Sequence, residues 1–478
     1  MADPQADPQA DFQLADWCVQ PAVNRLQRGN EAVQIEPKMM DVLVYLAGRQ
    51  GDVVRKRDII DNVWKTKYVS ESVISRAIAG LRKALGDRAQ SPQYIATIPK
   101  RGYQLLPVIR RPPGSSASPS VPEAPGLDRP FVVGQWVSGH RFYGRACHID
   151  EILNGPRSSI WLLGTRAIGK TSMLRQIELI AGSSEQSGFV PVFWDMQGAA
   201  SCRELGSLFE EAVLDAEDHF SAAGIEISSA LGTDLFTAIG RLRRLTRKSG
   251  RRLLLLCDEV DQLIELHRSD PGLLGKLRRA LQSSTDIRSV IASSPRLWAL
   301  AAQRDATSPF LHGFTPPLYL TPLQDDEASA LIFQRQIPEG SRVRIDNAAA
   351  ALVLERCGNH PFLLQMVCSQ LLEVGDANEA VEKTLSDRAA AFFFAVDFDL
   401  LGELDRAILR ALACTQTPDL DTVAEACGAP PRDIETGIHR LQNLGFVRLE
   451  DRHIRLVNEL FRRWLCDVRP AADAESSP

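Results

Sequence analysis

Residues 160–173 read IWLLGTRAIGKTSM, an apolar run that leads into a glycine-rich loop ending in Gly-Lys-Thr. The loop, Gly164 to Thr171, fits the pattern G-x-x-x-x-G-K-[ST]. The apolar residues before it predict a buried strand and the residues after it predict a helix, which is the setting that a phosphate-binding loop requires. In such a loop the backbone N–H groups and the helix N-terminus converge on an anion. The stretch therefore predicts a nucleotide site in an α/β domain.

Single positions of this loop receive predicted roles. Lys170 is expected to reach the β- and γ-phosphates as a catalytic residue, and Thr171 is expected to hold Mg²⁺. No Asn-Lys-x-Asp guanine motif occurs in the expected region, which favours ATP over GTP. The cofactor-binding residues predicted from the loop are Gly164, Thr165, Arg166, Ala167, Ile168, Gly169, Lys170, Thr171 and Ser172.

A second motif, RRLLLLCDEVDQL at residues 251–263, follows the loop in the chain. Its apolar run predicts a buried strand that ends in Asp258 and Glu259. A carboxylate at such a strand end can orient the water shell of Mg²⁺, and the next glutamate can align or deprotonate an attacking water. Asp258 is therefore a predicted metal ligand and Glu259 a predicted catalytic residue. The alternative is an acidic strand end of the kind that any α/β protein can have.

Over roughly residues 140–395 these motifs together resemble the AAA+/STAND class of P-loop ATPases. FYGRACHIDEIL is similar to the lead-in segment of that class, which implies that Arg145 lies near the nucleotide. SVIASSPRLWAL resembles the sensor strand and implies a catalytic role for Arg296, although the proline before it departs from the usual pattern. CGNHPFLLQMV resembles the turn of the helical lid, which implies that Pro361 lies against the adenine. His360 is expected to be a packed or capping residue.

The charge of the chain is unevenly distributed. The net charge is −5, but Phe12 to Arg111 contain 17 Lys and Arg against 9 Asp and Glu, a local charge of +8 that leaves −13 for the rest. A basic N-terminal part on an acidic remainder indicates a polyanionic partner for the N-terminal part.

The same N-terminal part has a recognisable pattern of elements. Two strand-like segments precede three helical segments, and YIATIPKRGYQLL at residues 94–106 predicts a hairpin with a basic tip. The block resembles an OmpR-type winged helix of the CadC/ToxR-like kind, which implies that its third helix enters the major groove of double-stranded DNA and its wing touches the backbone. A solvated basic face is the alternative. The DNA-binding residues that the resemblance implies are Ser72, Ser75, Arg76 and Ala79 on the helix, Arg82 and Lys83 near phosphates, and Lys100 and Arg101 at the wing tip.

Residues 398–468 predict three helices, a hairpin and a closing helix, which resembles a second winged helix. The third helix is not strongly basic, because Arg432 and Arg440 are expected to face Asp433 and Glu435. This favours a packing or autoinhibitory role over DNA reading.

The fold class predicted for the chain is multidomain α/β. The predicted parts are a disordered N-terminus at 1–11, a winged helix at 12–109, a Pro/Ser-rich linker at 110–130, a P-loop ATPase core at 131–325, a helical lid at 326–397, a C-terminal winged-helix-like domain at 398–468 and a disordered tail at 469–478.

Composition limits the cellular setting. The N-terminus lacks the basic and apolar regions of a signal peptide, and no apolar run approaches the ~20 residues of a membrane span. Nine cysteines without a Cys-x-x-Cys pair are typical of reduced core residues. We therefore expect a cytoplasmic protein that does not contact a membrane.

Three functional hypotheses follow. The first is a sequence-specific transcription regulator whose ATPase, with slow turnover, controls homo-oligomerisation or exposure of the N-terminal winged helix in response to an unidentified protein or small-molecule effector. The second is a DNA-dependent ATPase for DNA processing or phage defence, with winged helices as DNA clamps. The third, a signalling scaffold whose winged helix binds protein, is disfavoured by the basic charge of the N-terminal part.

Overall fold

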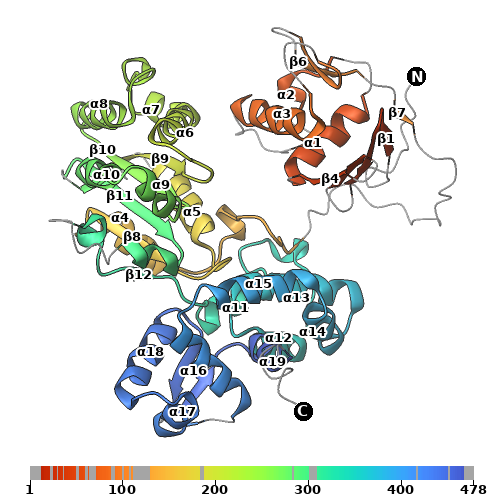
Figure 1. Cartoon of the computed structure of the whole chain (residues 1–478), viewed down its shortest axis with the longest axis vertical. Helices are drawn as coiled ribbons and strands as arrows, with labels where there is room; N and C mark the ends of the chain where they lie inside the picture. The colour runs from red at the N-terminus through yellow and green to blue at the C-terminus, as the bar shows by residue number, and fades with distance from the viewer. Residues whose placement is uncertain are drawn as a thin grey trace, which may run out of the picture. The chain divides into compact units, whose positions relative to one another are not determined.

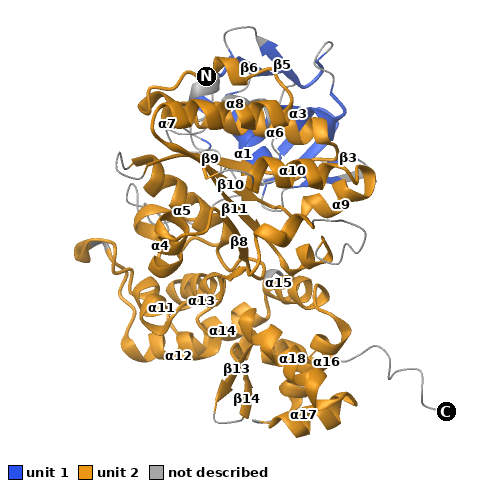
Figure 2. Cartoon of the chain, turned by 90° about the vertical axis from the view of Figure 1, so that its left-hand side faces the viewer, with its two compact units in different colours: residues 1–125 blue, residues 126–478 orange. Residues whose placement is uncertain are grey.

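The computed structural model divides the chain into two compact units, residues 1–125 and 126–478 (Figure 2). Among the residues it describes, no helix has the length and hydropathy needed to cross a membrane. The predicted N-terminal segment 1–11, most of the predicted linker and the predicted tail lie outside these residues. The described residues are 12–21, 25–28, 31–35, 37–49, 53–59, 63, 71–87, 92–98, 102–106, 109–110, 130–183, 188–282, 285–300, 309–415, 418–450 and 453–467.

The first unit is a winged helix (Figure 1). A five-stranded antiparallel sheet, ordered β4-β3-β2-β1-β7, accompanies three helices and a separate β5–β6 hairpin. The hairpin was predicted from the sequence, and so were the two strands that directly precede the first helix, β3 and β4. Strands β1, β2 and β7 were not predicted. The elements are β1 (Phe12–Leu14), β2 (Trp17–Gln20), β3 (Arg25–Arg28), β4 (Glu31–Gln34), α1 (Pro37–Ala47), α2 (Lys56–Ile59), α3 (Glu71–Leu85), β5 (Ile95–Ile98), β6 (Gly102–Leu105) and β7 (Ile109–Arg110).

Helix α3 is held by an apolar stripe with helical spacing. Ala77, Ile78, Leu81 and Leu85 are all buried in one core with α1 and the sheet. Because one face of the helix is committed to this core, its opposite face is left for solvent or a partner.

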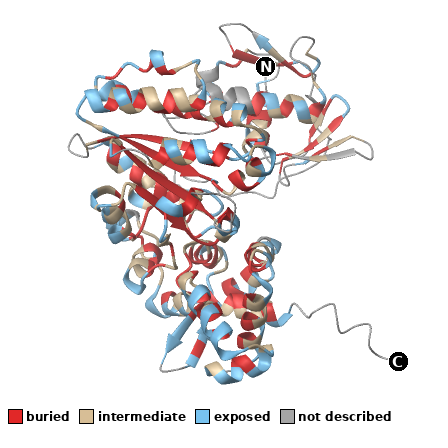
Figure 3. Cartoon of the chain, turned by 60° about the vertical axis from the view of Figure 1, so that its left-hand side comes forward, coloured by how far each residue is buried: buried red, intermediate tan, exposed pale blue. Residues whose placement is uncertain are grey.

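The second unit is built around a parallel sheet ordered β12-β8-β11-β10-β9. The four strands β8, β9, β10 and β11 are almost wholly buried and appear red in Figure 3. Asp258 at the end of β10 pairs in register with Asp195 of β9, and Ser293 of β11 pairs with Leu163 of β8. The carboxyl ends of four strands therefore lie at one edge, the edge at which α/β sheets place ligands.

Helices cover both faces of this sheet. One face packs against α6, α8, α9 and α10, and the other packs against α4 and α5. The elements are α4 (Ala146–Asn154), β8 (Ser159–Leu163), α5 (Lys170–Ser183), β9 (Phe189–Asp195), α6 (Cys202–Asp215), α7 (Glu217–Ala222), α8 (Leu235–Lys248), β10 (Arg252–Asp258), α9 (Gln262–Ser269), α10 (Leu273–Gln282), β11 (Ile287–Ser293) and β12 (Leu318–Tyr319).

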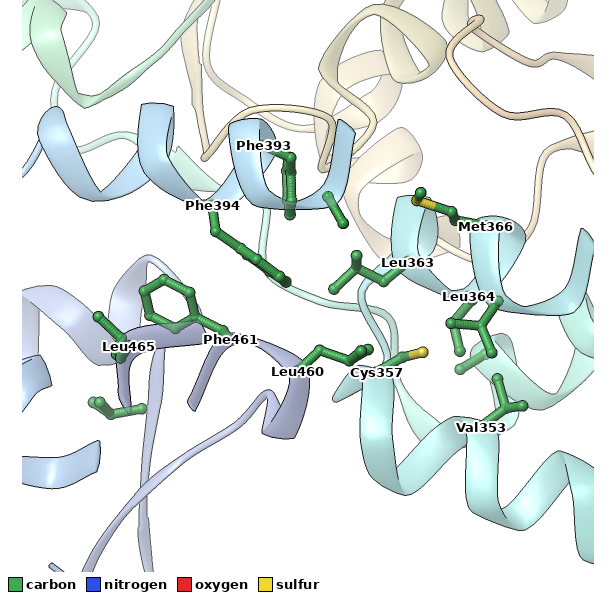
Figure 4. Close-up of a cluster of buried hydrophobic side chains, with 14 of the residues drawn as sticks. Val353, Cys357, Leu363, Leu364, Met366, Phe393, Phe394, Leu460, Phe461 and Leu465 are labelled. Carbon is green, nitrogen blue, oxygen red and sulfur yellow. The ribbon is translucent and has the colours of Figure 1, made fainter. Parts of the chain in front are cut away.

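The remaining elements form a helical lid followed by a small C-terminal module. Both belong to a single hydrophobic core, in which Phe461 of the last helix packs against Phe394 with ring centroids 5.4 Å apart (Figure 4). The lid and the module are therefore one packed body. Their elements are α11 (Asp325–Ile332), α12 (Asn347–Cys357), α13 (Pro361–Val374), α14 (Ala377–Leu385), α15 (Arg388–Asp399), α16 (Glu403–Cys414), α17 (Leu420–Cys427), α18 (Pro431–Asn443), β13 (Val447–Glu450), β14 (His453–Leu456) and α19 (Glu459–Asp467).

Candidate nucleotide site and DNA-reading helix

The loop between β8 and α5 has the backbone of an anion-binding turn. Ala167 and Gly169 both have positive φ, 52° and 104°, which turns the chain back on itself before α5. A Cβ on Gly164 would lie 2.8 Å from the Ile168 side chain and 2.9 Å from the Leu320 carbonyl oxygen, so the loop closes tightly only around glycine. Such alternation of backbone conformations makes an N–H-lined concavity for anions.

Lys170, the first residue of α5, lies within this loop. Its Nζ donates hydrogen bonds to the carbonyl oxygens of Gly164 at 3.0 Å and Thr165 at 2.8 Å. Burial lowers the pKa of Lys170, while nearby carboxylates, Asp397 and Asp258 foremost, oppose that shift. The loop thus holds one enclosed cation facing acidic groups.

The two predicted metal ligands are brought together. Thr171 Oγ1 donates a hydrogen bond of 2.6 Å to Asp258 Oδ2, and Asp258 Oδ1 accepts one of 3.0 Å from the Glu259 N–H. Burial raises the pKa of Asp258. A hydroxyl and a carboxylate at the mouth of a phosphate loop are the oxygen donors that Mg²⁺ prefers, so these residues fit that ion.

The two other predicted catalytic residues differ in surroundings. Glu259 has φ 50°, and desolvation followed by the Asp258 charge raises its pKa. Arg296 is exposed, and its N–H donates to Ser294 Oγ at 3.2 Å. Ser294 in turn donates hydrogen bonds from its N–H and its hydroxyl to Asp261, a half-buried acid two residues after Glu259. Arg296 is therefore attached to the Glu259 segment by way of Ser294.

Arg145 lies beneath the loop and joins it to the lid. Only 5% of the residue is exposed, and its Nη2 donates to the Ile168 carbonyl oxygen at 3.5 Å. Its N–H donates to Glu327 Oε1 of α11 at 2.7 Å. Burial lowers the pKa of Arg145 to about 10, against the attraction of Glu327. The predicted lead-in residue thus connects phosphate loop and lid.

The lid turn places His360 near the loop, where it lines the same space as Thr165 and Ile168, whereas Pro361 does not line that space. Pro361 is the first residue of α13. Among the described residues, neither ring nitrogen of buried His360 has a hydrogen-bond partner, and burial, Arg145 and Lys170 lower its pKa to about 3. His360 is therefore neutral at ordinary pH, which fits the packed residue that the sequence predicted. Beside it, about 450 Å³ of space not filled by protein is lined by residues that include Thr165, Ile168, His360, Phe393, Asp397 and Phe446.

Sequence reasoning missed Asp397. This residue of α15 is only 6% exposed, and its Oδ1 accepts a hydrogen bond of 2.9 Å from the Arg166 N–H of the phosphate loop. Burial raises the pKa of Asp397 to about 6, although Arg166 and Lys170 lower it. No local motif marks this carboxylate, because it reaches the loop only through the tertiary fold.

The predicted DNA-reading helix is α3, and its described side chains divide into two groups. Ala79 and Lys83 are exposed. Arg82 turns to the wing, donating to the Ile95 carbonyl oxygen at 2.8 Å and Thr97 Oγ1 at 2.9 Å, so it links helix and hairpin. Outside the described structure lie the side chains of Ser72, Ser75 and Arg76 and the whole of Lys100 and Arg101.

One predicted contact in the C-terminal module is wrong. Arg440 does not face Asp433 or Glu435; its Nε and Nη2 donate to the two carboxylate oxygens of Asp405 in α16, at 2.7 and 2.5 Å. The reason is tertiary: α18 packs on α16, and Asp405 is buried there with a side-chain exposure of 4%. This cation is committed to holding the module together.

Comparison with known proteins agrees with the two folds. Residues 29–105 match the family "Transcriptional regulatory protein, C terminal". The chain is 40% identical over 126 residues to the transcriptional activator CadC of Escherichia coli, covering 24% of this chain and 25% of that protein. It is also 40% identical over 78 residues to the cholera toxin transcriptional activator of Vibrio cholerae, covering 16% and 26%. The chain thus spans about a quarter of the length of these relatives.

The second unit has a different structural relative. The Walker-type ATPase PABY2304 of Pyrococcus abyssi covers 68% of this chain and 96% of its own, with a TM-score of 0.52 and 18% identity, which establishes the fold alone. The chain therefore carries an N-terminal winged-helix domain of the OmpR/PhoB type and a unit with the fold of Walker-type ATPases. The predicted fold class and the resemblance to an OmpR-type winged helix are confirmed; for the second resemblance, the fold of a Walker-type ATPase is confirmed.

Proposed function

We propose that this chain is a DNA-binding transcription regulator in which an ATP-binding unit acts as a switch. Support for the DNA-binding part comes from the family match at residues 29–105 and from relatives that are named transcriptional activators. The local charge of +8 between Phe12 and Arg111 is complementary to duplex DNA. Lys83 on α3 and the basic wing tip would contact phosphates, while the outer face of α3 would read bases.

The switch would be set by nucleotide in the loop between Gly164 and Ser172. The tight loop, the enclosed Lys170 and the Thr171–Asp258 pair support ATP with Mg²⁺ as the cofactor. Bound there, ATP would supply a chain of phosphates whose terminal bond can be hydrolysed. Glu259 would align the attacking water, and Arg296 would lie near the terminal phosphate; turnover is expected to be slow.

The observation that carries the switch is the hydrogen bond between the Arg166 N–H and Asp397. A backbone N–H of a phosphate loop is an anion ligand, and here the anion is a carboxylate of the chain itself. We infer that Asp397 must leave the loop when phosphates are held by the same N–H groups. Because α15 shares its core with the C-terminal module, the departure of Asp397 would move the module as well.

The open arrangement would expose surfaces for homo-oligomerisation and so array several N-terminal domains on one DNA. Joining modest binding modules raises effective concentration, so affinity for DNA can rise without new base contacts. A protein or small-molecule effector would then act by favouring one arrangement over the other. A protein that works in this way on DNA is expected in the cytoplasm.

Sedimentation of the whole chain tests the switch. Wild type and Lys170→Ala would be compared with ADP and with ATP-Mg²⁺, each with and without duplex DNA from the protein's own upstream region. The switch predicts that ATP moves wild type, but not Lys170→Ala, to a larger species that binds this DNA more tightly. An unchanged mass in all four nucleotide conditions contradicts it.

The second candidate is a DNA-dependent ATPase for DNA processing or phage defence. Its support is Glu259, which lies beside Asp258 as hydrolysis requires. Phosphate release that is strongly stimulated by duplex DNA of any sequence, without a change in mass, would favour this candidate over the regulator.

A further inference from the structure

The second unit has a concentrated basic surface far from its nucleotide site. Residues 241–252 read RLRRLTRKSGRR and contain seven arginines and lysines but no acidic residue. We call Arg243, Arg244, Arg247, Lys248, Arg251 and Arg252 the basic rim. Because the rest of the chain is acidic, its overall composition does not explain this cluster of basic residues.

The rim covers the outer side of one helix end and the start of the next strand. On α8 the side chains of Ile239, Leu242 and Thr246 are buried against the sheet, which turns the intervening cations outward. Arg244, Arg247 and Lys248 are exposed, as is Arg252 at the start of β10, and Arg243 and Arg251 are half-buried. Helix α10, which packs beside α8, adds three cations and also contains no acidic residue.

Most of these charges are not neutralised within the described part of the chain. Arg247 has a long ion pair of 3.4 Å with Asp286, and Arg252 stacks on Phe189 at 4.3 Å. Among the residues that the structure describes, Arg243, Arg244, Lys248 and Arg251 have no ion-pair partner. The dipole of α8 favours cations in its last turn, but it does not reach Arg243.

Positive charge also accumulates just behind the rim. Arg288 of β11 is buried and lies 5.2 Å from the Phe189 ring, whose centroid is also 4.3 Å from Arg252. Burial and then the charge of Arg252 lower the pKa of Arg288. Its guanidinium is held by the backbone carbonyl oxygens of Ile152, Leu153 and Gly155 and not by an acid. The fold thus retains like charges at this edge, which a polyanion would relieve.

We propose that the basic rim is a second contact surface for duplex DNA, which binds the phosphate backbone beside the site read by the N-terminal domain. This inference rests on the proposed DNA binding of that domain. Roughly 20 residues separate Arg110 from Pro130, and a chain of that length spans at most about 70 Å when extended. DNA held by the first unit therefore stays within reach of the second.

The rim can be altered without touching the nucleotide site. Arg252 begins β10 and Asp258 ends it, so about 20 Å of strand separates the rim from the phosphate-loop edge. The test variant carries Arg244→Gln, Lys248→Gln and Arg251→Gln. The matched control neutralises three cations elsewhere in the second unit, with Arg344→Gln, Arg410→Gln and Arg432→Gln.

Affinity of the whole chain for an upstream-region duplex long enough for both units would be measured over a range of salt concentrations. Each phosphate contact contributes about 0.9 to the slope of log affinity against log salt, so the rim variant should lose about 2.7 from that slope while the control keeps it. Affinity at moderate salt should fall at least tenfold, and nucleotide affinity should not change.

Three outcomes overturn the inference. They are an unchanged slope in the rim variant, an equal loss in the control, and a rim whose neutralisation weakens binding of RNA or an acidic peptide but not of duplex DNA. Failure of the proposed function looks different, since wild type itself would then bind no duplex.

Discussion

Acidification and the substitution Asp397→Asn should both weaken nucleotide binding if the Asp397 contact must open. In the closed arrangement burial raises the pKa of Asp397 to about 6, whereas a solvent-exposed aspartate keeps a value near 3.8. Below about pH 6 the closed carboxyl takes a proton and the open one does not, so acid favours the closed arrangement. Well above pH 6 the carboxylate is ionised in both arrangements. The difference between the two pKa values then makes the free energy of closure less favourable by about 3 kcal/mol.

The size of both effects follows from these two pKa values. Between pH 7.5 and pH 5 the closed arrangement gains roughly tenfold over the open one, so nucleotide affinity should fall roughly tenfold. Asparagine is neutral at every pH and still accepts the Arg166 N–H bond, so it resembles the protonated acid. Asp397→Asn should therefore bind nucleotide roughly 10- to 100-fold more weakly than wild type at pH 7.5, without the pH dependence.

Calorimetric titration of the whole chain with ADP between pH 5 and 7.5 measures both effects. Phosphate groups of the nucleotide titrate in this range too, but their contribution cancels when the affinity of wild type is divided by the affinity of the variant at the same pH. Asp399→Asn on the same helix is the control, because Asp399 is exposed and should behave like wild type. If Asp397 instead stays beside the phosphates, asparagine removes a repulsion: tighter binding by Asp397→Asn, or wild-type affinity that rises on acidification, refutes the displacement.

Three further predictions concern the phosphate loop, the C-terminal module and the N-terminal unit. Gly169→Ala forces alanine into φ 104°, at a cost of about 1–3 kcal/mol, and should weaken nucleotide binding at least fivefold in the same titration while the N-terminal unit unfolds as before. Arg440→Leu leaves the buried Asp405 unpaired and should lower the free energy of unfolding of the second unit by about 3 kcal/mol in urea, with Asp405→Asn added to it restoring part of the loss. Arg82→Ala should lower the melting temperature of the N-terminal unit by removing two wing contacts worth about 1–2 kcal/mol, whereas Lys83→Ala should leave melting unchanged and reduce the salt slope of DNA binding by about 0.9.

The strand–loop–helix segment around Gly164 to Thr171 and helix α3 could be predicted because their sequence signals are local. The pattern from Gly164 to Thr171 lies within eight residues and has its strand and helix on either side. The apolar spacing of α3 likewise lies within fifteen residues, so period and capping identify it without knowledge of the fold. Short strands such as β1, with three residues, carry too little pattern to be distinguished from loop.

The contacts of Asp397 and Arg440 could not be predicted, because their partners are distant in the sequence. Asp397 contacts a loop residue more than two hundred positions away, and an aspartate near the end of an apolar helix looks like any other. Arg440 has acidic neighbours along its own helix, yet it binds Asp405 on another because helix packing brings that buried acid within reach. In both cases the packing of the helices determines the contact partner, and a single sequence does not show how its helices pack.

The distribution of unpaired and ion-paired cations indicates which part of the second unit would contact DNA and which part would respond to nucleotide. In the C-terminal module, Arg440 is bound to Asp405, and Arg448 and Arg455 of the hairpin both lie within 4 Å of Glu450, at 3.9 and 3.6 Å. The core of the module is continuous with that of α15, which carries Asp397. A module in which these three cations are paired and whose core is shared with the lid is suited to transmit the state of the phosphate loop. DNA contact by this unit, by contrast, would fall to the basic rim at the opposite edge of the sheet, where Arg243, Arg244, Lys248 and Arg251 have no ion-pair partner among the described residues.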